Sequence, residues 1–229
     1  MEEVKTNSEK GEATRARLIE VGTRLFGTHG YHGVSVRMLA KEAGVNLAAV
    51  GYHFGGKPGL YQAIVQKSIH AAQTGPPAFD ERFFETLNGI ETREEMSQFV
   101  DRFVREFMNL LMGKEENLWV ALIMHNETHK PTEQFAQLFD NIGDPVMRCF
   151  GAIVAAATGD PVGSDENFIA AFAICGMCLH FVEGHPYFLP RIGWQTYEEK
   201  HVEIIGRIVS GQILRALDLP PYTNAGDSK

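Results

Sequence analysis

Apolar positions recur at helical spacing along this chain, and no stretch keeps the strict alternation of a half-buried strand. Residues 35–57 show the pattern most clearly. Ser35 is a suitable N-cap for a short helix, which Gly44 can end in the left-handed conformation. Four apolar residues share one face of that helix: Val36, Leu39, Ala40 and Ala43. Asn46 can cap a second short helix over about 47–53, so this stretch predicts a helix-turn-helix.

The outer face of the second helix has an unusual composition. Val50 and Phe54 are spaced to face inward, which leaves small and aromatic residues outside rather than Lys, Glu or Gln. These outer residues are Leu47, Ala48, Ala49, Gly51, Tyr52 and His53. Small side chains allow a helix to enter a DNA groove, and Tyr52, His53 and Lys57 supply phosphate donors. A helix pair buried in an ordinary bundle is the alternative that spacing leaves open.

The rest of the pattern predicts an all-α chain. Expected helices cover about 13–28, 57–72, 79–87, 92–112, 118–128, 131–157 (bent around 143–145), 165–183 and 196–217. Thr92 and Glu95 form the sequence signature of a capping box. We expect a flexible arm (1–12), a three-helix helix-turn-helix DNA-binding domain (13–73), a second helical domain (78–218) and a flexible tail (219–229). The ligand-binding and dimerisation role expected of the second helical domain rests on a family resemblance given below.

Charge is divided unevenly between these parts. The chain of 229 residues has a net charge of −8, yet residues 1–68 hold nine Lys/Arg and six Asp/Glu, a net of +3. The excess positive charge therefore lies with the helix-turn-helix, where phosphate neutralisation requires it. The first fifteen residues have no apolar core, and the longest apolar run, 168–182, is shorter than the ~20 residues of a membrane span. We expect a cytoplasmic protein with no membrane partner.

Two further constellations suggest other chemistry. Cys175 and Cys178, with His180 nearby, could form a redox or zinc pair, but they lie in an apolar helix where cysteine is usually a small buried hydrophobe. His125 and His129 are spaced for a metal, although a surface pair is the simpler interpretation. A near match to a phosphate-binding loop at 51–57 lacks the Ser or Thr that follows its lysine. No nucleophile motif is present, so we expect no catalytic residues, metal or cofactor.

The C-terminal part contains aromatic and Met side chains that fit either a core or an apolar pocket between helices. They are Phe107, Trp119, Ile123, Met124, Phe135, Leu138, Met147 and Phe150. The helices over 165–183 and 196–217 are apolar on more than one side, which favours a dimer interface if they are not buried within one subunit. Its expected residues are Ala170, Ala173, Gly176, Met177, Ile205, Ile208 and Val209.

Residues 13–64 resemble the DNA-binding domain of the TetR family of bacterial transcription regulators. Four segments carry the likeness: RLIEVGTRLF (17–26), GYHGVSV (30–36), LAKEAGV (39–45) and YHFGGKPGL (52–60). The resemblance implies DNA contacts at Ser35, Val36, Arg37, Asn46 to Ala49, Gly51, Tyr52, His53 and Lys57. Gly51 departs from the bulkier residue usual in the family. The remaining chain, especially 118–139, is similar to a TetR subgroup with a CerR-type C-terminal domain.

The resemblance also implies a function. We expect a homodimeric repressor that occupies a palindromic double-stranded DNA operator and is released by a small-molecule effector. Paired half-sites require a two-fold symmetric protein, and the last two helices are similar in position to those that pair in TetR-family dimers. The alternatives are a DNA-binding sensor of redox state or metal through Cys175 and Cys178, or a small helical enzyme or nucleotide-binding protein.

Overall fold

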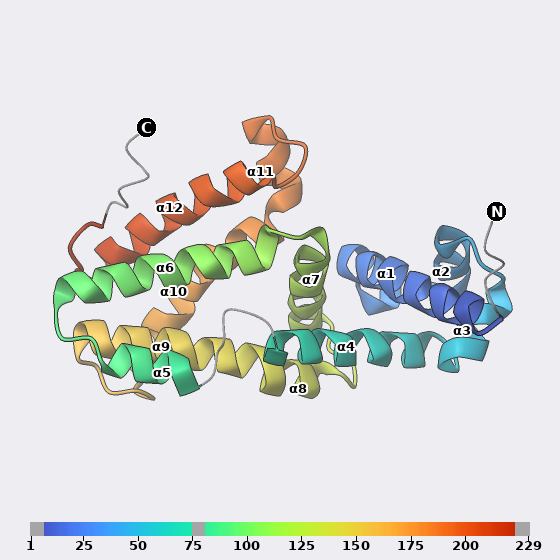
Figure 1. Cartoon of the computed structure of the whole chain (residues 1–229), viewed down its shortest axis with the longest axis horizontal. Helices are drawn as coiled ribbons and strands as arrows, with labels where there is room; N and C mark the ends of the chain where they lie inside the picture. Colours follow the sequence, from blue (N-terminus) through green and yellow to red (C-terminus); the bar gives the residue numbers. More distant parts are fainter. Residues whose placement is uncertain (1–6, 75–80, 223–229) are drawn as a thin grey trace. The chain divides into compact units, whose positions relative to one another are not determined.

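A computed structural model describes residues 7–74 and 81–222, and in these ranges the chain is helical with no strand, as expected. The helices run in the order shown in Figure 1: α1 (Asn7–Gly33), α2 (Val36–Ala43), α3 (Leu47–Phe54), α4 (Lys57–Thr74), α5 (Glu81–Asn88), α6 (Arg93–Met112), α7 (Glu115–His129), α8 (Phe135–Leu138), a π-helical turn (Phe139–Gly143), α9 (Asp144–Thr158), α10 (Asp165–Glu183), α11 (His185–Ile192) and α12 (Glu199–Ala216). The expected break at 74–77 lies almost entirely outside the described residues, as do most of the tail and the first half of the arm.

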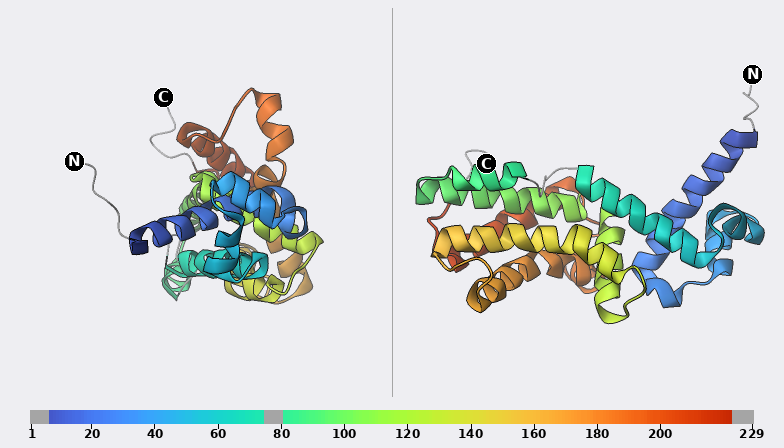
Figure 2. Two further views of the ribbon diagram at one scale, coloured as in Figure 1. Left: turned by 90° about the vertical axis from the view of Figure 1, so that its right-hand side faces the viewer. Right: turned by 90° about the horizontal axis from the view of Figure 1, so that it is seen from below.

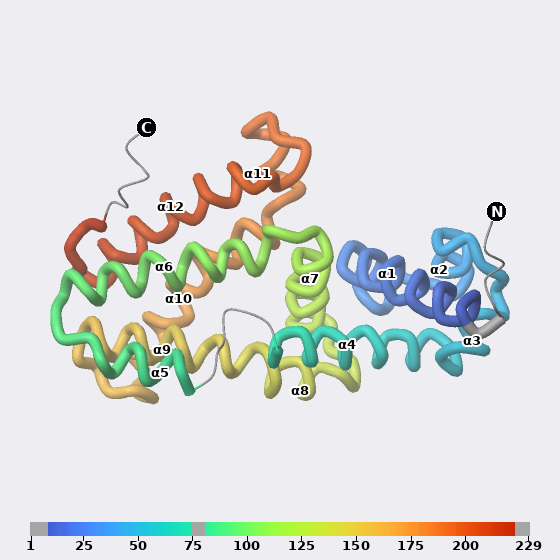
Figure 3. Tube along the Cα trace, in the orientation of Figure 1, coloured from blue at the N-terminus to red at the C-terminus, as the bar shows by residue number. Residues whose placement is uncertain are grey.

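The chain forms two compact units that are not consecutive in sequence. The first unit contains the chain up to Ala71 together with Trp119–Phe139, and the second contains Ala72–Leu118 and the residues from Asp140 onward. Figure 3 traces how the chain leaves the first unit after α4 and contributes to it again with α7. The expected domains were consecutive ranges, whereas most of α7 belongs with the helix-turn-helix.

In the first unit, local capping produces the helix-turn-helix as predicted. The Ser35 hydroxyl accepts a hydrogen bond from Met38 N–H (3.2 Å), and Gly44 ends α2 with φ of +66°. Asn46 Oδ1 then accepts from Ala48 N–H (3.0 Å) at the start of α3. The inner face of α1 is buried, which gives the three helices a common core: Leu18, Val21, Gly22, Leu25 and Phe26.

Helix α1 begins earlier than the expected Ala13. Residues 7–12 continue it as a helix, because nothing in their sequence breaks one and Gly11 lies beside His53 of α3. The regular part of α1 ends at Gly30, whose φ of +67° and ψ of +166° are not helical. The residues from there to Gly33 form a separate last turn. The polar arm expected over 1–12 therefore has its second half inside α1.

The second unit has a core formed by α6, α9, α10 and α12. Helix α12 packs along α6, and α10 packs on α9, which the further views in Figure 2 also display. The capping box predicted at the start of α6 is present, with Glu95 N–H donating to the Thr92 hydroxyl at 3.1 Å. Among the described residues α10 alone has the length and composition of a membrane span, a test that core helices also pass, and its inner side is buried in this unit.

The structure differs from the predicted helices in two further respects. The segment expected as one bent helix over 131–157 is divided into α8, the π-helical turn and α9, which starts at Asp144 with Pro145 in its first turn. Proline is favoured there because its missing N–H has no partner within the helix in any case. Helix α11 was not predicted, because its sequence HPYFLPRI contains two prolines and is only eight residues long.

Candidate nucleic-acid interface

The outward face of α3 is exposed and carries no charged side chain along its helical turns. Val50 is fully buried and anchors the helix, whereas Tyr52 is 86% exposed and Leu47 is 48% exposed. Ala48 and Gly51 are also exposed, and Ala49 and His53 are half-buried. A Cβ added at Gly51 would have nothing within 4 Å, so the helix backbone is open to close approach there. A helix face with small, uncharged side chains can approach the base edges in a DNA major groove closely.

Four of the predicted contacts lie at the starts of the two short helices: Ser35, Val36, Arg37 and Asn46. Ser35 and Arg37 are exposed, and Val36 is half-buried. Ser35 and Asn46 use oxygen atoms as helix caps, which leaves the Ser35 O–H and the Asn46 amide N–H groups as donors. These groups lie at helix N-termini, where backbone dipoles also favour an anion.

Lys57 is at the first position of α4 and is half-buried. Its ammonium lies 4.1 Å from the centroid of the Tyr31 ring, a cation–π contact that sequence reasoning did not find. Burial lowers the pKa of Lys57 from its ordinary value. The junction before Lys57 is tight, because a Cβ at Gly59 would overlap the carbonyl oxygen of Phe54.

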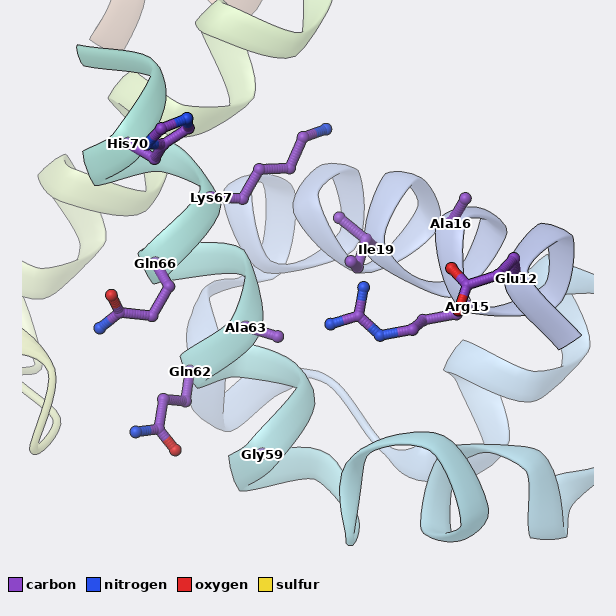
Figure 4. A pocket seen from close by; sticks show the side chains of 10 residues that line it. All are labelled: Glu12, Arg15, Ala16, Ile19, Gly59, Gln62, Ala63, Gln66, Lys67 and His70. Carbon is purple, nitrogen blue, oxygen red and sulfur yellow. The ribbon is translucent and has the colours of Figure 1, made fainter. Parts of the chain in front are cut away.

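A shallow groove of about 760 Å³ runs between α1 and α4 in the first unit (Figure 4). Its lining mixes Glu12 with the basic residues Arg15, Lys67 and His70. The Arg15 guanidinium is also 5.3 Å from the centroid of Phe54, at the end of α3. None of the eight side chains predicted for an effector pocket lines this groove.

The predicted effector-pocket residues are distributed over both units. Phe107, Met147 and Phe150 are in the second unit, and the other five are in the first: Trp119, Ile123, Met124, Phe135 and Leu138. Phe107 and Phe150 are buried with ring centroids 5.4 Å apart, in an aromatic cluster that also includes Phe103. Ile123 and Leu138 are core residues, and Phe135 is 36% exposed.

The predicted dimer residues are also divided. Ala173, Gly176, Met177 and Ile208 are exposed, and Ala170 is half-buried. Ile205 and Val209 are only 3% and 4% exposed within the subunit, so they are unavailable to a partner. They face α6, because α12 packs along that helix. Ile204, 40% exposed, lies beside Ile208 on the free side of α12 instead.

The structure gives the cysteines a structural role. Cys175 and Cys178 are buried, and desolvation, with a smaller contribution from Glu183, raises the pKa of Cys175 to about 12. Burial raises the pKa of Cys178 as well. A protonated thiol is a poor nucleophile and metal ligand. Within residues 7–74 and 81–222, no three His, Cys, Asp or Glu side chains are grouped as metal ligands, and the rings of His125 and His129 lie 4.5 Å apart.

Sequence reasoning also missed a buried polar connection between α4 and α7. Glu127 is 1% exposed, and its Oε1 accepts a hydrogen bond from the Tyr61 hydroxyl at 2.5 Å. Glu127 lies four residues after the buried Ile123 on the same face of α7. The sequence did contain a signal for this connection, because Glu127 is a carboxylate at an inward-facing position of the helical pattern.

Comparison with known proteins agrees with this geometry. Residues 18–64 match the family model of bacterial regulatory proteins of the tetR family, and residues 96–218 match the C-terminal domain of the HTH-type transcriptional dual regulator CecR. CecR of Shigella flexneri is 27% identical over 207 residues, which cover 89% of this chain and 91% of that protein.

Solved structures share the fold at lower identity. AibR, in a structure with isovaleryl coenzyme A and operator DNA, has a TM-score of 0.62 and 17% identity, covering 91% of this chain and 100% of that one. The hemolysin II transcriptional regulator HlyIIR has a TM-score of 0.57 and 19% identity, covering 87% of this chain and 98% of that one.

The capped α2–α3 pair and the exposed, uncharged face of α3 define a helix-turn-helix DNA-binding transcription regulator. The chain belongs to the TetR family of bacterial regulatory proteins, in the group that carries the CecR C-terminal domain. The C-terminal likeness that the sequence indicated as CerR-type is thus to the CecR domain.

Proposed function

We propose that this regulator is a cytoplasmic homodimeric repressor that occupies a palindromic operator and leaves it when a small molecule binds. The observation that carries the proposal is the exposed face of α3, on which Ala48, Gly51 and Tyr52 leave the backbone open for a groove. Helix α3 reads base edges, while Lys57 and the caps of α2 and α3 contact phosphates on either side.

Dimerisation is supported by an exposed apolar surface on α10. We define the α10 face as Phe168, Ile169, Phe172, Ala173, Gly176 and Met177. Phe168, Ile169 and Phe172 are 58%, 66% and 64% exposed, an unusual concentration for a solvent-facing helix. Ala173 and Gly176 allow a second helix to approach closely, and Ile204 and Ile208 of α12 add to the same kind of surface.

We propose that the effector site lies in the second unit. The cluster of Phe103, Phe107 and Phe150 offers apolar surface between α6 and α9. The half-buried Met147 lies three residues before Phe150 in α9. An effector that separates these rings would bind only to a rearranged second unit. Its higher affinity for that state would supply the free energy that releases the protein from the operator. The chemistry of the effector is left open.

The test is selection of bound sequences from random duplex DNA, followed by affinity measurement with Ala48→Glu. Ala48 is exposed, so this change places a carboxylate against base edges and phosphates without burying it. Ala136→Glu, an equally exposed alanine on α8, is the matched control. We expect at least a hundredfold loss of operator affinity for Ala48→Glu and near-normal affinity for Ala136→Glu. Normal binding by Ala48→Glu would remove α3 as the reading helix.

A reporter assay decides the sign of regulation. A gene placed behind the selected sequence should be silenced by the wild-type protein and expressed with Ala48→Glu. Activation by the wild-type protein would contradict repression while leaving DNA recognition intact.

A further inference from the structure

Lys57 is held in place before any DNA is present. The residue is half-buried and its ammonium is 4.1 Å from the centroid of the Tyr31 ring, although a lysine at a helix start would ordinarily extend into solvent. The ring face attracts the cation and limits the rotamers of its long side chain. A lysine restrained in this way loses less conformational entropy when it meets a phosphate.

Tyr31 is itself fixed by two other aromatic rings. The Tyr61 ring, from α4, is 4.9 Å away at a tilt of 49°, and the Phe26 ring, from α1, is stacked at 5.9 Å. Phe26 and Tyr61 also meet edge to face at 4.9 Å. Three rings that contact one another in pairs leave Tyr31 little freedom to move while Tyr61 keeps its position.

Tyr61 is positioned by Glu127 of α7. The Glu127 carboxylate is buried and accepts hydrogen bonds from the Tyr61 hydroxyl (2.5 Å), the Thr132 backbone N–H (2.8 Å) and the Thr132 hydroxyl (2.9 Å). Three donors to one buried carboxylate are a satisfied and therefore rigid arrangement. Burial and the hydrogen bond to Glu127 raise the pKa of Tyr61, so its hydroxyl remains a donor throughout the physiological pH range.

Helix α7 is also anchored on α1 through Asn126. Its side-chain amide donates to the carbonyl oxygen of Gly27 at 2.8 Å and lies 3.4 Å from that of Phe26. Phe26 thus contacts both α7 and the aromatic group. Glu127 and Asn126 are adjacent, so the same turn of α7 holds two members of the aromatic group, Tyr61 and Phe26.

We propose that Tyr31, held through Tyr61 by Glu127, is a positioning residue that presents Lys57 to a DNA phosphate. This inference rests on the proposed DNA-binding function and adds that three residues outside the helix-turn-helix surface set the strength of one backbone contact. The first residues of α7, Glu115 to Leu118, belong to the second unit, and the rest of the helix belongs to the first.

The first experiment needs no DNA. In the wild-type protein with labelled lysine, the ring of Tyr31 should shift the Lys57 Hε proton resonances upfield of those of exposed lysines. Tyr31→Leu should abolish this shift, Tyr31→Phe should keep it, and Tyr61→Phe and Glu127→Gln should reduce it. An unshifted Lys57 in the wild-type protein would overturn the positioning role, whatever the outcome of DNA binding.

The second experiment is a double-mutant cycle on the selected operator, with Kd measured against KCl concentration. Tyr31→Leu should weaken binding about three- to tenfold, as expected when a released lysine side chain must lose its rotamer freedom on binding, and Tyr31→Phe should restore it. Lys57→Ala should lower the salt slope by about one unit. In the Lys57→Ala background, Tyr31→Leu and Glu127→Gln should have no further effect on affinity.

Additive losses would mean that Tyr31 and Glu127 only stabilise the fold, and would overturn the inference while the proposed function stands. Thermal unfolding of each variant, measured in parallel, separates a folding defect from a binding defect. Absence of any DNA binding by the wild-type protein would instead remove the proposed function on which the inference depends.

Discussion

The buried carboxylate of Asp101 in α6 accepts a hydrogen bond from the Ser210 hydroxyl of α12 at 2.6 Å. Both residues are nearly inaccessible, with exposed fractions of 3% and 0%. Asp101 also accepts from Arg105 Nε at 2.9 Å, one turn further along α6. The pair fixes how α12 packs on α6, and it thereby decides which side of α12 is free for a partner.

We predict that Asp101→Ala lowers the free energy of unfolding by about 3 kcal/mol. The change leaves the buried Ser210 hydroxyl without this acceptor and removes one carboxylate partner of the mostly buried Arg105. Glu106→Ala, an exposed carboxylate on the same helix, should be within about 0.5 kcal/mol of the wild-type protein. Urea unfolding at a fixed protein concentration measures both, and equal values for the two variants would contradict the structural role of Asp101.

A pair of glycine substitutions should have opposite effects. A Cβ at Gly27 would lie 2.8 Å from the Trp119 carbonyl oxygen, so Gly27→Ala must push α1 and α7 apart at a cost of about 1–3 kcal/mol. A Cβ at Gly51 meets nothing, and Gly51→Ala should stabilise α3 by about 0.5–1 kcal/mol. Thermal unfolding of both variants checks this contrast. A stable Gly27→Ala protein would show that α7 does not pack tightly on α1.

The cysteines should be inert below strongly alkaline pH. Burial raises the pKa of Cys175 from 9.0 to about 12, so the folded state retains a proton that the unfolded chain releases. Stability from this group is therefore fully present below about pH 9 and decreases as the pH rises towards 12. Modification of native protein by an aromatic disulfide at pH 8 should be slow compared with urea-unfolded protein.

Replacing both thiols tests the sensor hypothesis directly. Cys175→Ser with Cys178→Ser should leave operator binding in oxidant or zinc unchanged and should only lower stability. An oxidant response in the wild-type protein that disappears in this double variant would favour redox sensing after all.

The α10 face should determine the oligomeric state. Phe172→Glu places a charge in the centre of that face and should convert a dimer into a monomer at micromolar concentration, because a buried unpaired charge costs several kcal/mol. Val162→Glu is the matched control, since Val162 is 69% exposed and lies outside α10. Sedimentation velocity of the three proteins measures the result. A monomeric wild-type protein with full operator affinity would contradict the proposed mechanism.

Helix identities could be predicted wherever the chain carries its own start and stop signals. Ser35, Asn46 and Thr92 cap helices as the sequence indicated, because capping is a local interaction between a side chain and the next turn. The burial of Val50 followed from periodicity for the same reason. Helix α11 was missed because two prolines within eight residues argue against a helix, although Pro186 lies in its first turn, where proline is tolerated.

The site was predicted only in its local part. The outer residues of α3 follow from helical spacing, but the contact between Tyr31 and Lys57 depends on how α1 and α4 pack, which no sequence spacing encodes. Ile205 and Val209 were misassigned because periodicity identifies an apolar side of α12 without telling whether α6 or a second subunit covers it. The role of Glu127 required knowing that α7 returns to the first unit.

The return of Trp119–Phe139 to the first unit has a consequence for synthesis on the ribosome. The helix-turn-helix leaves the exit tunnel early, but Tyr61 lacks its buried acceptor and Gly27 its neighbour until α7 has also been translated. At the usual elongation rate of about 5–20 residues per second, that interval lasts several seconds. A nascent chain therefore exposes an incomplete DNA-binding unit, which is open to chaperones and proteases, and acquires its finished form only when more than half of the protein has been made.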